Sequence, residues 1–84
     1  MPVLCRFYGI IIKMYFLQSE HNPPHIHAQY GENVAAVGIL SGDVIEGNLP
    51  PKALSLVREW TELHKEELLH MWKTQEFRQL PPLD

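Results

Sequence analysis

The sequence predicts an α+β fold, a small antiparallel β-meander of about four strands with one long C-terminal helix packed on one face. Over residues 7–49, short runs rich in β-branched and aromatic residues alternate with turn residues, and the links are too short for crossover helices. From Pro51 to Gln75 the chain has no glycine and no further proline, and its apolar residues recur every three or four positions. The spacing of the apolar residues therefore predicts strands before Pro51 and a helix after it.

Each strand has its own signal. The first is expected over residues 7–16, where every even-numbered residue from Tyr8 onward is apolar. Residues 18–24 are expected to form a loop, because two consecutive prolines cannot supply the N–H donors that a strand interior needs. The second strand is expected over His25–Tyr30, and the last two over residues 34–40 and 44–49.

The helix is expected to run unbroken from Pro51 to Gln75. Proline suits the first turn of a helix, because the N–H that it lacks has no intrahelical partner there. An apolar stripe along the helix matches the apolar face of the sheet, so the two should pack together. The predicted core consists of Ile10, Ile12, Ile26, Val37, Ile39, Leu54, Val57 and Trp60.

Length and composition narrow the class of protein. Eighty-four residues predict a single α+β domain over residues 1–76, followed by an extended tail over residues 77–84. A net charge of −3 argues against a protein that coats nucleic acid by general electrostatic attraction. The 45% hydrophobic content exceeds what one small core can hide, which predicts a homodimer or a protein partner. Tyr15, Trp72 and Phe77 are the candidates for this extra apolar surface.

The sequence also predicts a cytoplasmic protein with no membrane segment. The longest apolar run is interrupted by Lys13 and is shorter than the roughly 18 to 20 residues that cross a bilayer. The N-terminal residues lack the basic and then apolar pattern of a signal peptide. Cys5 has no second cysteine to pair with, which fits a reducing compartment.

Three of the five histidines fall within seven residues, at His21, His25 and His27. His25 and His27 are two apart on an expected strand, so both imidazoles should project from one exposed face. Pro23 and Pro24 stiffen the approach and can hold His21 near that pair. The sequence therefore indicates a candidate site in which three imidazoles surround one ligand.

Three uses of this site stay open. In the first, His25 and His27 share general acid and general base roles on an RNA phosphodiester, with Lys13 and Gln29 binding the substrate. In the second, His21, His25 and His27 ligate a divalent metal such as Zn, for which imidazole is a common ligand. In the third, the histidines are purely structural and the chain is an interaction module.

Several motifs resemble those of the small bacterial domain-of-unknown-function family 4160. They are residues 6–16, the run His21-Asn-Pro-Pro-His-Ile-His27, residues 42–47, Leu49-Pro-Pro51 and Val57-Arg-Glu-Trp60. The resemblance extends over residues 3–73, and the His-Asn-Pro-Pro-His motif is its most specific part. Members are often encoded beside another small protein in what looks like a toxin–antitoxin pair. The resemblance therefore implies a component of a toxin–antitoxin-like module that acts through a small co-encoded partner, and it implies no reaction.

Overall fold

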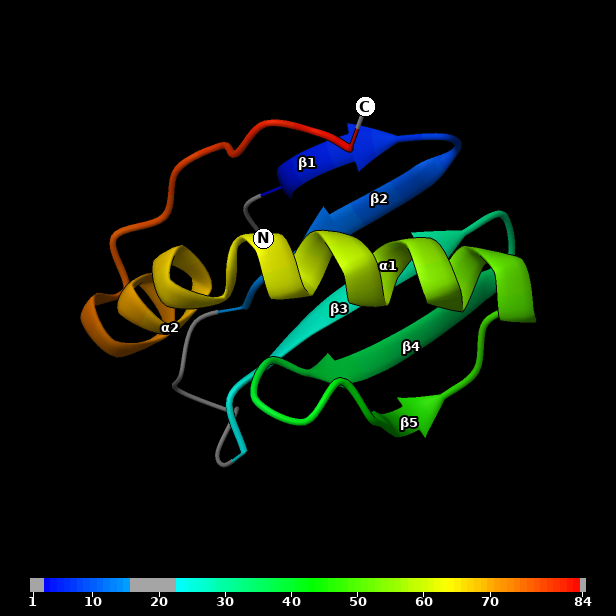
Figure 1. Ribbon diagram of the computed structural model, residues 1–84, viewed down its shortest axis with the longest axis horizontal. Coiled ribbons are helices and arrows are strands. Elements are labelled where there is room, and N and C mark those ends of the chain that lie inside the picture. The colour runs from blue at the N-terminus through cyan, green and yellow to red at the C-terminus, as the bar shows by residue number, and fades with distance from the viewer. Residues whose placement is uncertain (1–2, 16–22, 84) are drawn as a thin grey trace.

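The computed structural model describes residues 3–15 and 23–83, which form an antiparallel sheet and two helices (Figure 1). Within these described residues, five strands follow one another across the sheet in chain order, which confirms the predicted α+β meander. No helix within the described ranges has the length and apolar character needed to cross a bilayer. The elements are β1 (Val3–Phe7), β2 (Ile10–Lys13), β3 (His25–Tyr30), β4 (Asn33–Gly38), β5 (Val44–Gly47), α1 (Pro51–Leu63) and α2 (Lys65–Thr74).

The expected first strand over residues 7–16 is wrong, because the chain reverses at Tyr8 and Gly9. These residues have φ angles of 49° and 80°, and Phe7 pairs with Ile10 across the turn. Two consecutive positive φ angles are typical of a two-residue hairpin turn, and the sequence that usually forms this turn is Asn-Gly. Here tyrosine replaces asparagine, so the sequence does not show the usual turn signal. The sheet consequently has five strands where four were expected.

The core lies between the sheet and α1, which crosses one face of the sheet (Figure 1). Seven of the eight predicted core residues are buried, and Leu54 is partly buried against the same cluster. Trp60 is fully buried and stacks on Phe7, with 6.0 Å between ring centroids. Full burial of each large apolar side chain contributes about 1.5–3 kcal/mol before entropy is counted. The match between strand alternation and helical stripe is confirmed.

The expected single helix is also wrong, because the chain leaves helical geometry at His64, where φ is −111° and ψ is 21°. Three residues earlier, the Thr61 hydroxyl donates a 2.7 Å hydrogen bond to the Val57 carbonyl. A hydroxyl that bonds the carbonyl four residues back tends to bend a helix. The apolar stripe continues past this point, so the sequence pattern does not reveal the break.

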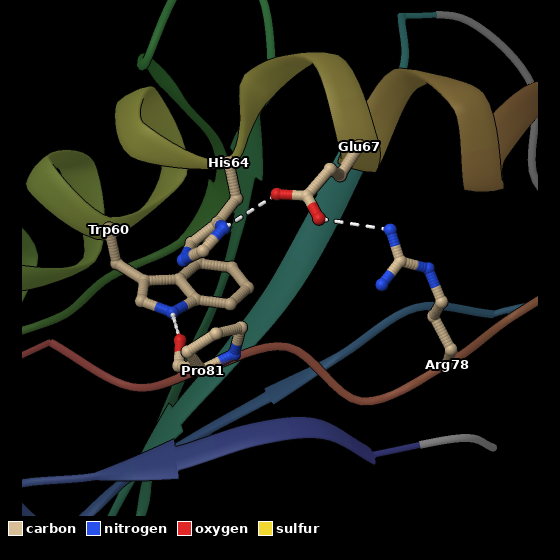
Figure 2. Close-up of polar contacts among 5 residues, drawn as sticks. All are labelled: Trp60, His64, Glu67, Arg78 and Pro81. Atoms are coloured by element: carbon tan, nitrogen blue, oxygen red, sulfur yellow. Dashed lines mark hydrogen bonds and ion pairs between the residues drawn. The ribbon is translucent and has the colours of Figure 1, made fainter.

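Side chains brace the junction between α1 and α2. The His64 Nδ1–H donates to Glu67 Oε1 at 2.9 Å, and Arg78 Nη2 donates to Glu67 Oε2 at 2.9 Å (Figure 2). The His64 ring lies 4.9 Å from the Trp60 ring, measured between centroids. With the junction held in this way, α2 lies beyond one end of the sheet, off the line of α1 (Figure 1).

After α2, residues 75–83 contain no helix or strand and run back beside β1 (Figure 1). The Leu80 N–H donates to the Leu4 carbonyl at 2.8 Å, and Leu80 itself is buried. The Trp60 Nε1–H donates to the Pro81 carbonyl at 2.8 Å (Figure 2). This segment therefore packs along the outer edge of β1 and satisfies the buried indole nitrogen.

Candidate functional site

Strand register places four of the predicted site residues on one side of the sheet. Lys13 lies opposite His27, and residues that are opposite each other in an antiparallel pair point to the same side. His25 and Gln29 share that side because each is two residues from His27. Ile26 and Ala28, between them, are fully buried on the side of α1. We call Lys13, His25, His27 and Gln29 the histidine face.

His25 is more enclosed than the sequence suggested. Its Nδ1–H donates to the Pro23 carbonyl at 2.7 Å, and its ring centroid lies 5.0 Å from that of Trp72. The residue is 8% exposed, so the expectation that both imidazoles project into solvent is wrong for His25. The reason is the break at His64, since α2 then carries Trp72 against the beginning of β3.

His27 is half-buried and lies beside two aromatic rings. Its centroid is 5.1 Å from that of His25 and 4.2 Å from that of Tyr15, which meets it edge-on at 82°. Sequence reasoning treated Tyr15 as surplus apolar surface and missed this contact. The available signal was parity, because Tyr15 is two residues beyond Lys13, the residue opposite His27.

The two residues predicted to bind substrate contact each other. Lys13 Nζ donates to Gln29 Oε1 at 3.3 Å, and both side chains are half-exposed. Gln29 lies opposite Ile11 on β2 and Val34 on β4, so these two apolar side chains belong to the same side of the sheet. An amine, an amide and two imidazoles are thus gathered around the middle of β3.

The two prolines before β3 contribute through their carbonyl groups. The Pro23 carbonyl accepts from His25, while the Pro24 carbonyl accepts a 2.9 Å hydrogen bond from the Ile39 N–H. One bond sets the orientation of the His25 ring, and the other ties the loop to the end of β4. A stiff entry into β3 is therefore part of how the site is held.

The third predicted metal ligand, His21, lies outside the described residues. Within the described parts of the chain, no three His, Cys, Asp or Glu side chains come close enough together to hold a metal ion. His25 and His27 are the two predicted ligands that the structure places, and they are adjacent. The three-histidine metal site therefore stays a prediction.

The geometry of His25 suits either a ligand or a base. In a neutral imidazole, a donating Nδ1–H makes Nε2 the acceptor nitrogen, and a backbone carbonyl commonly fixes metal-binding and catalytic histidines in this way. The low exposure of His25 limits the size of what can reach it, whereas His27 and Lys13 are more accessible. Chemically, the face fits an anionic group or a metal ion at the His27 side.

The fold and this face together define a small α+β domain with a histidine-centred sheet surface. The chain belongs to the family described as Domain of unknown function (DUF4160), whose profile matches residues 9–73. This match confirms the family resemblance, and the matched segment includes the four residues of the histidine face. No curated protein and no solved structure matches the chain.

Proposed function

We propose that this chain is the partner-binding component of a two-protein module of the toxin–antitoxin type, and that the histidine face is its contact surface. The family resemblance supports a small co-encoded partner. One structural observation carries the choice of surface, namely the apolar and aromatic side chains that lie among the polar residues on this side of the sheet. Ile11 and Tyr15 are half-exposed there, and Val34 is 48% exposed.

These side chains depart from the usual pattern of a solvated sheet face, on which alternate residues are polar. Aromatic residues are enriched at protein interfaces, and the centre of an interface is depleted in charge. Tyr15 against His27 and the apolar pair Ile11 and Val34 supply such a centre. Covering this exposed apolar surface with a partner removes it from water, which stabilises the complex.

The charged residues around this centre indicate which charges a complementary partner would carry. Arg6 lies opposite Ile11 and therefore joins Lys13 on the β1–β2 half of the face, whereas Glu46 lies opposite Ala36 on the β5 half. A complementary partner places carboxylates over Arg6 and Lys13. Such charges at the rim of an interface contribute chiefly to the association rate and the orientation of the complex.

A second function is favoured by the imidazole pair. His25 and His27 lie 5.1 Å apart between centroids, and Lys13 is opposite His27. This is the set of groups that acid–base cleavage of an RNA phosphodiester needs, with Lys13 stabilising the developing negative charge. A divalent metal such as Zn, held by His21, His25 and His27, is the alternative use of the same imidazoles.

The partner proposal is tested by co-expression with the small protein encoded next to it, followed by affinity capture and growth assays of each protein alone. Val34→Asp should reduce capture about tenfold, because it puts an unpaired charge into the apolar centre. Leu63→Asp is the matched control, since Leu63 is 66% exposed on α1, away from this face. Equal capture by wild type and both variants would refute the proposed surface.

The catalytic and metal alternatives are tested on purified protein without an affinity tag. Cleavage of a short RNA that persists in EDTA and is lost in His27→Ala supports the acid–base pair. Stoichiometric zinc by elemental analysis, reduced in the same variant, supports the metal site. His70→Ala is the control, because His70 is exposed on α2 outside the histidine face. Neither RNA cleavage nor bound metal is expected if the surface acts through the partner alone.

A further inference from the structure

A second candidate site lies at the opposite end of the molecule from α2. The turn between β1 and β2, the end of β3 and the beginning of α1 lie together there (Figure 1). Together with the C-terminal segment they line an open cavity of about 560 Å³, within the range of small-molecule sites. Its lining includes Tyr8, Tyr30, Lys52, Leu56, Glu59 and Leu83. We call it the tyrosine cavity.

Tyr8 has a backbone conformation that tyrosine rarely adopts. Its φ is 49°, in the left-handed region where a bulky side chain is strained and asparagine or glycine is preferred. Burial does not offset this strain, because Tyr8 is 58% exposed. A strained residue whose ring is exposed at the wall of a cavity indicates a role in binding.

Tyr30 forms a second aromatic wall. Its ring lies against Gly9, where an added Cβ would meet Tyr30 Cε1 at 3.4 Å, and the residue is 40% exposed. Leu56 and Leu83 add apolar surface, both of them partly buried. Two tyrosine rings above an apolar lining suit an aromatic ligand, because aromatic pairs attract each other beyond their area of contact.

The lining of the cavity also carries opposite charges at two positions along α1. Lys52 and Glu59 are seven residues apart, which corresponds to about 10 Å along the helix axis. The first turn of α1 has no side-chain cap and no acidic residue, so the Lys52 end is positive. A ligand with one carboxylate therefore binds with that group toward Lys52 and away from Glu59.

We propose that the tyrosine cavity binds a small organic acid, with an aromatic ring between Tyr8 and Tyr30 and a carboxylate facing Lys52. The cavity is distinct from the histidine face, because Ile10, which also lines it, points to the α1 side of the sheet. The proposal is therefore independent of partner binding through the histidine face, and either can fail alone.

The test is an NMR titration in which 3-phenylpropionate is added to the full chain and the chemical shifts of the backbone amides are followed. Shifts should be confined to the β1–β2 turn, the end of β3 and the first turns of α1. The uncharged analogue 3-phenylpropanol should bind about threefold more weakly, as should 3-phenylpropionate to Lys52→Gln. Lys73→Gln on α2 is the matched control and should bind as wild type does.

Tyr8→Asn separates binding from folding. Asparagine accepts the left-handed conformation, so this variant should melt at a higher temperature than wild type while binding the probe about tenfold more weakly. Tyr30→Leu should weaken binding without relieving strain, and Leu40→Asn, at an exposed position outside the cavity, should leave binding unchanged. Wild-type affinity in both tyrosine variants, or probe-induced shifts away from the cavity, would overturn the proposal.

Discussion

The two sides of β3 carry different tasks within six consecutive residues. Ile26 and Ala28 are fully buried beneath α1, whereas His27 and Gln29 on the other side are half-exposed. Burial explains the first pair completely, because the core requires apolar side chains there. It does not explain an imidazole that lies opposite a lysine and against a tyrosine ring on the second side. The comparison teaches that one strand supplies stability and a candidate site from alternate positions.

His25 stands between these two roles. It shares a side with His27, yet Trp72 of α2 packs on it and leaves it 8% exposed. The covering helix is directed there by the junction at His64, whose ring bonds Glu67. Substitutions in β3 and at this junction can therefore separate the structural histidine from the accessible one.

The largest effect is expected for Ile26→Ala on the α1 side. Removing most of a fully buried side chain should lower the free energy of unfolding by about 2–5 kcal/mol, through lost burial and the cavity left behind. The measurement is urea denaturation followed by circular dichroism. Val34→Ala, on the other side of the sheet and 48% exposed, should change it by less than about 0.5 kcal/mol. Equal losses in the two variants would contradict the assignment of the sides.

His25→Ala should have an intermediate effect. It removes the hydrogen bond to the Pro23 carbonyl and the ring contact with Trp72, so about 1–3 kcal/mol of stability should be lost. Thermal unfolding by calorimetry measures this loss. A melting temperature equal to that of wild type would show that the enclosure of His25 contributes nothing to the fold.

Glu67→Gln tests the junction and should cost less than about 1 kcal/mol at neutral pH. The hydrogen bond from His64, followed by that from Arg78, lowers the pKa of the Glu67 carboxyl from its ordinary value of 4.5. A lowered pKa in the folded state stabilises the fold above pH 4.5, and this contribution is lost as the pH falls through the lowered value.

Acid titration of stability provides the check on this junction. The difference in unfolding free energy between wild type and Glu67→Gln should shrink as the pH drops below 4.5. Glu62→Gln serves as the control, because Glu62 is exposed on α1 and has no part in the bonds around His64. If the difference in unfolding free energy does not change with pH, the ionised Glu67 carboxylate does not stabilise the junction between α1 and α2.

The smallest effect on stability is expected for His27→Ala, within about 0.5 kcal/mol, because the side chain is only half-buried. The same variant should lose partner capture, RNA cleavage or metal uptake if the histidine face is functional. Chemical denaturation and the binding assay are carried out on one preparation. A loss above about 2 kcal/mol together with intact activities would mark His27 as structural.

The alternation along β3 was predictable, whereas the turn between β1 and β2 and the break between α1 and α2 were not. A period of two assigns His25 and His27 to one side whatever packs around them. The turn at Tyr8 was not predicted, because tyrosine rarely adopts a left-handed conformation and here continues an apolar run typical of a strand. The break at His64 was not predicted because the apolar stripe passes through it unchanged.

The sequence by itself determined that strands precede helical structure, that α1 carries an apolar stripe and that His25 and His27 share one side of the sheet, because these features follow from local periodicity. Tertiary structure alone decided how accessible His25 and His27 are. Exposure depends on which distant element packs nearby, and Trp72 reaches His25 only after the chain turns at His64. The tyrosine cavity likewise requires four segments far apart in the chain to meet, which no local pattern encodes.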